Sequence, residues 1–144
     1  MHSFVKYWIP VVAWMLLIFV MSGDLMSAEH TSRFFVPFLR WIAPGISDET
    51  VASLQLLLRK CAHLVEYAIL AALLWRALAR GSREFGRAAW GAFVIAAVYA
   101  SLDELHQSFI PSRTGALQDV VIDCGGAILG LVLYRFGRRF LRRG

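Results

Sequence analysis

The sequence predicts an all-α, polytopic membrane protein, a bundle of four transmembrane helices with an interfacial helical segment between the first two spans. The chain has 144 residues, of which 58% are hydrophobic, and its mean hydropathy is +0.59. This composition is too apolar for a soluble domain of that length. Because about 20 apolar residues cross about 30 Å of hydrocarbon, we expect one membrane domain over residues 1–144 with spans at residues 5–22, 61–79, 88–105 and 116–134.

The first span resembles a signal peptide, since Lys6 precedes a short apolar run. The pattern of small residues needed for cleavage is poor, because Met26 lies three residues before the one convenient cut, after Ala28. We therefore interpret residues 5–22 as a retained helix.

The segment after the first span alternates aromatic and basic residues. Arg33 and Arg40 are interleaved with Phe34, Phe35, Phe38, Trp41 and Ile42. This pattern is typical of a short helix in the head-group layer, and we expect an interruption near Pro37. The segment serves either as an aromatic belt that anchors the bundle or as a lid over a site.

A new helix is expected after the Pro44-Gly45 turn. Ser47 is a typical N-cap, and Asp48 and Glu49 supply acids to the first turn. The helical pattern can run from there to Ala79, which is about 33 residues or about 50 Å. The first third of such a helix must project from the membrane, tilt or kink.

The distribution of Lys and Arg predicts the orientation, because cytoplasmic connections are enriched in these residues. One side carries ten of them: Lys6, Arg76, Arg80, Arg83, Arg87, Arg135, Arg138, Arg139, Arg142 and Arg143. The other side carries five: Arg33, Arg40, Arg59, Lys60 and Arg113. Both termini are therefore expected in the cytoplasm. Attraction to anionic lipid head groups explains the cytoplasmic arginines, and we expect no nucleic-acid partner.

Polar side chains gather in three short strings. They comprise Arg59, Lys60, His63, Glu66 and Tyr67, then Asp103, Glu104 and Gln107, then Arg113, Asp119 and Asp123. One charged residue at the centre of a membrane helix costs roughly 2.5–3.5 kcal/mol, so such residues mark a functional site by default. Steps of three and four residues place each string on one helix face. Antiparallel neighbours then bring the strings together in an outward-facing bowl.

Five acids and three bases meet in this bowl, so with neutral histidines its balance is minus two. Crowded carboxylates relieve repulsion by pairing or by binding a proton or cation, and we expect ion pairs plus a bound proton or divalent metal ion. The candidate metal ligands are His63, Glu66, Asp103, Asp119 and Asp123. Each ion pair alone has a structural alternative, which is to pin two helices together. The expected pairs are Lys60 with Glu66, and Arg113 with Asp119 or Asp123.

Two further features concern packing. Gly126 and Gly130 are four residues apart, which favours close packing within the chain, with homodimerisation as the alternative. Cys61 and Cys124 form no C-x-x-C pair and are expected to be small core residues, although a disulfide between them stays open.

The segments RKCAHLVEYAIL and DELHQSFIPSRTGALQDVVIDCGGAILG closely resemble the VanZ-like family, whose pattern is K-x-x-H-x-x-E-Y, then D-E-x-x-Q-x-F-x-P-x-R, then D-x-x-x-(D/N)-x-x-G. The resemblance covers essentially the whole chain, and Asp123 stands where many members have Asn. It implies a small multi-pass protein of the bacterial cytoplasmic (inner) membrane. The namesake member confers low-level resistance to the glycopeptide teicoplanin.

The leading hypothesis is that the bowl binds an envelope lipid or a lipid-linked cell-wall component. In this interpretation Arg59, Lys60 and Arg113 contact a phosphate, and the other ligand-binding positions are Tyr67, Asp103, Glu104, Gln107, Asp119 and Asp123. An alternative is a metal-assisted hydrolase or transferase acting on a lipid phosphate, with His63 and Glu66 as its catalytic residues. A third is a proton-linked transporter that uses Glu66 and Asp123 as carriers.

Overall fold

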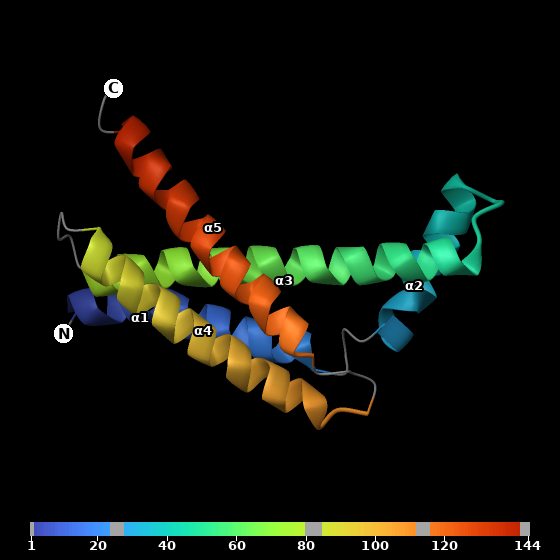
Figure 1. The fold of residues 1–144 in the computed structure, drawn as a ribbon, viewed down its shortest axis with the longest axis horizontal. Coiled ribbons are helices and arrows are strands. Elements are labelled where there is room, and N and C mark those ends of the chain that lie inside the picture. The colour runs from blue at the N-terminus through green and yellow to red at the C-terminus, as the bar shows by residue number, and fades with distance from the viewer. Residues whose placement is uncertain (1, 24–27, 80–84, 112–115, 142–144) are drawn as a thin grey trace.

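The computed structural model describes residues 2–23, 28–79, 85–111 and 116–141. These residues form five helices and no strand: α1 (His2–Ser22), α2 (Ala28–Ile42), α3 (Asp48–Ala79), α4 (Gly86–Ser108) and α5 (Leu117–Leu141) (Figure 1). Four of them, α1, α3, α4 and α5, are long and apolar enough to cross a membrane. The predicted all-α class and the four spans are confirmed.

The helices are longer than the apolar spans that predicted them. α4 continues past Leu105 to Ser108, and α5 begins at Leu117 and continues past Tyr134 to Leu141. Hydropathy marks only the part of a helix that suits hydrocarbon, whereas backbone hydrogen bonding continues into polar flanking residues. The extension of α4 places Gln107 on the same helix face as Asp103, one turn away.

The long helix α3 is the centre of the fold, because it contacts each of the other four described helices. α1 and α4 pack on it, and α5 crosses it obliquely (Figure 1). α3 has 32 residues, or about 48 Å, and its N-terminal third projects beyond the bundle with α2 beside it (Figure 1). The beginning of α1 and the end of α5 lie on the same side of the bundle (Figure 1).

The predicted start of α3 is confirmed by its cap. Ser47 Oγ accepts a hydrogen bond from the Thr50 backbone N–H at 3.2 Å, which satisfies one of the free donors of the first turn. Arg40, in the last turn of α2, pairs with Asp48 at 2.6 Å. This exposed contact joins the end of α2 to the beginning of α3.

α2 is continuous through Pro37, so the predicted interruption there is wrong. A proline removes one backbone hydrogen bond, but the helical bonds on both sides of it persist. The large side chains Phe34, Phe38 and Trp41 are exposed. An amphipathic helix with an exposed aromatic surface suits a place in the membrane interface.

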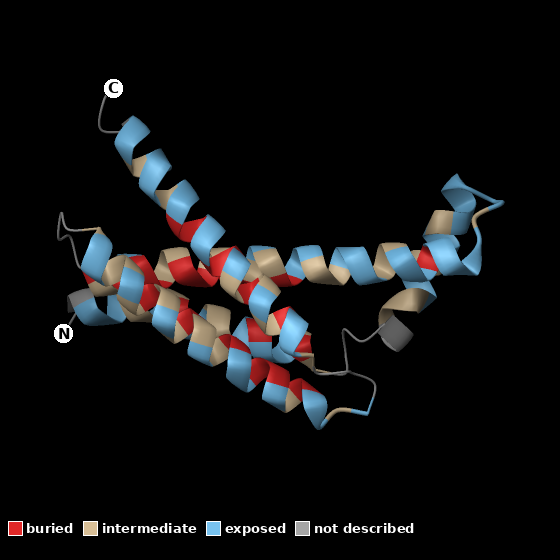
Figure 2. Cartoon of the chain, in the orientation of Figure 1, coloured by how far each residue is buried: buried red, intermediate tan, exposed pale blue. Residues whose placement is uncertain are grey.

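Burial is concentrated where α1, α3, α4 and α5 meet, and the outer surfaces of these helices are exposed (Figure 2). In α4 the small residues Ala92, Ala96 and Ala100 recur every fourth position and are fully buried. Aromatic side chains attach α1 to its neighbours: Trp14 Nε1 donates to the Glu66 carbonyl at 2.9 Å, and Tyr99 Oη donates to the Met15 carbonyl at 2.6 Å. The exposed outer surface is rich in large apolar side chains, as expected of helices that face lipid.

The backbones of α3 and α5 approach each other closely where the two helices cross. A Cβ built at Gly126 would collide with the backbone of Leu64, and one built at Gly130 would collide with the backbone of Ala68. Close packing within the chain, which the glycine spacing favoured, is therefore what the structure shows. Homodimerisation through the same glycines stays a hypothesis.

Both cysteines are free thiols. Cys124 is half-buried, but Cys61 is exposed, so the expectation that Cys61 is a core residue is wrong. Cys61 lies on the outer side of α3, where a small apolar side chain is compatible with lipid.

We predict that Gly130→Ala destabilises the protein by about 1–3 kcal/mol, because the added methyl group overpacks the crossing. Gly125→Ala is the matched control, since no atom lies within 4 Å of the place that its added methyl group would take. Chemical denaturation in detergent, followed by circular dichroism, measures both. Equal stability of the two variants would contradict the claim that the α3–α5 crossing leaves no room for a methyl group at position 130.

Candidate functional site

Nearly all polar side chains that the structure buries lie at one end of the bundle. This acidic end is formed by the C-terminal ends of α1 and α4, the N-terminal end of α5 and the middle of α3. The buried polar residues there are Ser22, His63, Asp103, Glu104, Gln107, Asp119 and Asp123. The structure thus brings the three polar strings of the sequence together.

Asp103 receives hydrogen bonds from three helices. Its Oδ2 accepts from Ser22 Oγ of α1 at 2.7 Å, from Gln107 Nε2 of α4 at 3.2 Å and from Tyr67 Oη of α3 at 3.5 Å. Only 3% of Asp103 is exposed. A buried carboxylate needs such donors, because its transfer out of water is otherwise very costly.

Asp119 forms ion pairs with two basic residues of α3. Its Oδ2 lies 3.0 Å from Arg59 Nη2, and its Oδ1 lies 3.9 Å from Lys60 Nζ. Asp119 is in the first turn of α5, where the helix dipole also favours a negative charge. The spacing argument did not name Asp119 as the partner of Lys60.

His63 and Asp123 form a buried pair one turn further along. His63 Nδ1 lies 3.2 Å from Asp123 Oδ1, and the Asp123 side chain is fully buried. The two atoms are within ion-pair distance, although their alignment is not that of a hydrogen bond. The sequence predicted His63 and Glu66 as a catalytic pair, and the structure adds the Asp123 carboxylate beside His63 Nδ1.

Several buried acceptors at the acidic end have no hydrogen-bond partner among the described residues. Glu104 Oε2 accepts the Ala116 backbone N–H at 2.7 Å, which caps the start of α5. The buried acceptor atoms that have no hydrogen-bond partner among the described residues are Asp103 Oδ1, Glu104 Oε1, Gln107 Oε1 and both Asp123 carboxylate oxygens. Such unsatisfied groups are uncommon in native proteins and indicate a place for water, protons or a ligand.

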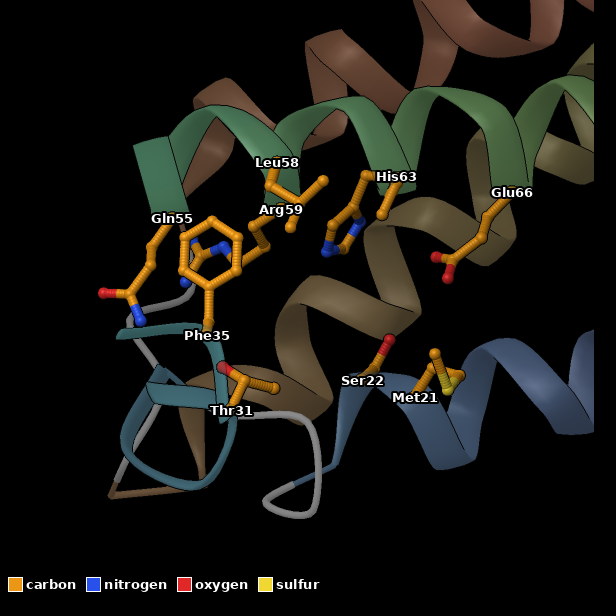
Figure 3. A pocket seen from close by; sticks show the side chains of 10 residues that line it. Met21, Ser22, Thr31, Phe35, Gln55, Leu58, Arg59, His63 and Glu66 are labelled. Atoms are coloured by element: carbon orange, nitrogen blue, oxygen red, sulfur yellow. The ribbon is translucent and has the colours of Figure 1, made fainter. Parts of the chain in front are cut away.

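A cavity of about 240 Å³ opens beside these groups. Figure 3 shows Arg59, His63 and Glu66 of α3 on one wall, Met21 and Ser22 of α1 on a second, and Thr31 and Phe35 of α2 on a third. Gln55, Leu58 and Ala62 complete the lining. The cavity therefore combines charged groups with apolar walls.

Two cavity residues have donors without acceptors among the described residues. Arg59 Nε and Gln55 Nε2 are buried N–H groups that make no hydrogen bond there. An unpaired buried donor costs about 1–3 kcal/mol. The cavity wall is thus suited to an acceptor-rich, anionic group.

Ten of the eleven predicted site residues lie at the acidic end, and Arg113 lies outside the described residues. Arg59 and Lys60 pair with Asp119, and Glu66 lines the cavity. The other seven belong to the buried polar contacts: His63, Tyr67, Asp103, Glu104, Gln107, Asp119 and Asp123. Ser22 was not predicted to line the site, whereas Phe35 belongs to the segment for which a lid over a site was one alternative. Ser22 ends an apolar span, which is a weak signal, and Phe35 reaches the cavity only because α2 folds back beside α3.

The described residues contain no group of three or more His, Cys, Asp or Glu side chains placed to hold a metal ion. Four of the five candidate ligands instead divide between the Asp103 contacts, the Asp119 contacts and the His63–Asp123 pair. The fifth, Glu66, lines the cavity. The geometry therefore favours paired and hydrogen-bonded carboxylates over a chelating cluster.

Fold and site together define a small multi-pass membrane protein with a charged cavity at one end of its helix bundle. The family model VanZ/LLP1 matches residues 7–140, nearly the whole chain. The chain belongs to this family. Neither a comparison with curated proteins nor one with solved structures gave a match.

We predict that Ser22→Ala lowers the free energy of unfolding by about 1–3 kcal/mol, because it removes the donor nearest to the buried Asp103 carboxylate. Denaturation in detergent measures the change. Ser101→Ala is the control, since Ser101 is exposed and donates to a backbone carbonyl of its own helix. An equal loss of unfolding free energy in Ser101→Ala would show that the Ser22–Asp103 hydrogen bond contributes no more to stability than an exposed one.

Proposed function

We propose that the acidic end faces outward from the bacterial cytoplasmic membrane and binds the phosphate-bearing head group of an envelope lipid or lipid-linked cell-wall component. The observation that carries this proposal is the pair of unpaired buried donors, Arg59 Nε and Gln55 Nε2, on one cavity wall. Phosphate oxygens accept hydrogen bonds from such groups, and a guanidinium matches phosphate geometry well.

The electrostatics of Arg59 support an anionic ligand. Its Nη2 is engaged by Asp119 at 3.0 Å, which holds the guanidinium in position, while Nε makes no hydrogen bond among the described residues. Lys60 adds a second positive charge, 3.9 Å from the same carboxylate. The pairing with Asp119 holds Arg59 at the cavity and Lys60 next to it on α3. It also lowers the net charge of these two cations, so a head group with few negative charges fits better than a polyphosphate.

The apolar walls support a lipid over a soluble phosphate. Phe35 of α2 and Met21 of α1 line the cavity on other walls than the charged groups, and Leu58 lines it next to Arg59 on α3 (Figure 3). A ligand with a polar head and a hydrocarbon chain satisfies both parts of this surface. α2 thereby acts as a wall of the site, in addition to any anchoring role in the interface.

Teicoplanin resistance, which the family resemblance implies, follows physically from such binding. A protein that sequesters or repositions a lipid-linked precursor changes the concentration or accessibility of the molecule that the antibiotic targets. The proposed resistance therefore depends on occupancy of the cavity.

We predict that Gln55→Leu weakens binding of a short-chain polyprenyl phosphate about tenfold, since a hydrogen bond to a charged group contributes about 1.5 kcal/mol or more. Arg59→Gln is expected to weaken it more. Native mass spectrometry of the detergent-solubilised protein, titrated with the lipid, measures both, and phosphatidylglycerol in a parallel titration distinguishes a cell-wall carrier from a general phospholipid.

Gln118→Leu is the matched control, because Gln118 is exposed on α5 and does not line the cavity. An equal loss in Gln118→Leu and Gln55→Leu would overturn the assignment of the cavity. Retained binding in both glutamine variants and in Arg59→Gln would overturn the proposed function.

The His63–Asp123 pair favours a second candidate, an enzyme that hydrolyses a lipid phosphate. Asp123 is directed at Nδ1 of His63, so Nε2 is the ring nitrogen available to a molecule in the cavity that His63 lines. A histidine held in this way is suited to take a proton from an attacking water.

Phosphate release from the same short-chain polyprenyl phosphate separates the two candidates. For an enzyme, His63→Gln lowers the rate by about 10²–10⁴-fold, the usual contribution of a general base, while binding persists. For a binding protein, the wild type releases no more phosphate than His63→Gln does. Circular dichroism checks that the variant is folded.

A further inference from the structure

A cationic pocket lies at the other end of the bundle, which we call the basic end. Lys6 of α1, Arg76 of α3 and Arg138 of α5 line one pocket of about 330 Å³. Its remaining lining residues are Tyr7, Trp75, Ala79 and Tyr134. Three helices that are far apart in sequence each contribute one positive charge.

Aromatic rings hold two of these cations in place. The guanidinium carbon of Arg138 lies 4.5 Å from the ring centre of Trp75, and that of Arg76 lies 5.5 Å from the ring centre of Tyr7. Trp75 is only 3% exposed, so its ring is a fixed surface. Stacking of this kind orients a guanidinium while its N–H groups remain available to an anion.

The pocket has no acidic counterpart within the described part of the chain. No described Asp or Glu lines it, and the ion pairs of the described residues involve Arg40, Arg59, Lys60 and His63. Three like charges around one concavity repel each other and focus a positive potential. A bound anion would relieve that repulsion.

An apolar groove continues from this pocket along the membrane-facing side of α3 and α5. It measures about 610 Å³ and shares Tyr134 and Arg138 with the cationic pocket. Its walls are aliphatic or small, among them Leu64, Ala72 and Leu133. A cationic pocket joined to an apolar groove matches a molecule with an anionic head and a hydrocarbon chain.

We propose that the basic end contains a site for an anionic phospholipid. The phosphate lies among Lys6, Arg76 and Arg138, and an acyl chain lies in the groove between α3 and α5. Basic pockets between transmembrane helices recognise anionic head groups in this way. The site shares no residue with the cavity at the acidic end and is independent of the function proposed there.

Native mass spectrometry of the detergent-solubilised protein, titrated with phosphatidylglycerol and separately with phosphatidylcholine, tests the proposal. The expected result is preferential retention of phosphatidylglycerol, weakened about fivefold by Arg138→Gln and about fivefold by Arg76→Gln. Arg138→Lys should retain most of the binding, since it keeps the charge. Arg138→Gln should cause the same fold loss in the wild-type and Arg59→Gln backgrounds, which separates the site from the acidic end.

Arg139→Gln is the matched control, because Arg139 is the next residue on α5, is exposed and does not line the pocket. An equal loss in Arg139→Gln and Arg138→Gln would reduce the effect to general surface charge and overturn the proposal. No preference for phosphatidylglycerol over phosphatidylcholine would also overturn it.

Two further measurements identify the source of the anion. Glycerol 3-phosphate, at the concentration of the lipid, should not displace phosphatidylglycerol, and Ala72→Phe, which fills the groove, should weaken lipid retention. Displacement by glycerol 3-phosphate, with no effect of Ala72→Phe, would assign the pocket to a soluble phosphate and overturn the lipid assignment.

Discussion

The close crossing of α3 and α5 is the constraint on which the rest of the structure depends. At Gly126 and Gly130 the absence of a side chain lets the α5 backbone reach the α3 backbone at Leu64 and Ala68. Because Asp119 and Asp123 precede these glycines on the same helix, the crossing sets their distance from Arg59 and His63. A wider crossing would leave buried carboxylates without cations, which is among the more costly arrangements in an apolar environment.

Once the crossing is made, the acidic end is held by charges shared between helices. Asp103 connects α1, α3 and α4, Asp119 connects α5 to α3, and Glu104 connects α4 to the start of α5. Within a membrane these contacts replace part of the hydrophobic driving force that lipid does not supply.

These contacts do not satisfy all the buried donors and acceptors at the acidic end, however. Arg59 Nε, Gln55 Nε2 and the Asp123 carboxylate oxygens make no hydrogen bond among the described residues, and they lie at or beside a cavity. A purely structural network would gain stability by satisfying them, which is why we interpret this end as a site.

The two ends of the helix bundle differ in the charged groups that they carry. Carboxylates dominate the acidic end, and its cations are paired with them. At the basic end, guanidiniums stack on aromatic rings with no acid among the described neighbours. The first arrangement holds cations in fixed positions at moderate net charge, which favours selective recognition of one head group. The second presents concentrated positive charge next to an apolar groove, which favours the more general chemistry of an anionic lipid.

The sequence by itself determined the class of protein and most elements. Four apolar runs predict four spans because hydrocarbon has a fixed thickness, Ser47 predicts the start of α3 because its hydroxyl caps the first turn, and the glycine spacing predicts a close helix contact. Periodicity also indicated which faces of α3, α4 and α5 are polar.

The contacts that each polar side chain makes with other helices were decided by the tertiary structure alone. Spacing within one helix cannot say that Lys60 lies near Asp119, that His63 faces Asp123, or that Ser22 donates to Asp103, since these contacts depend on crossing angles and on the relative height of helices. The sequence also cannot place Phe35 at the cavity, because α2 reaches the cavity only when it packs beside α3. Nor can it predict the pocket of Lys6, Arg76 and Arg138, because these residues come from three helices that meet only in the folded bundle.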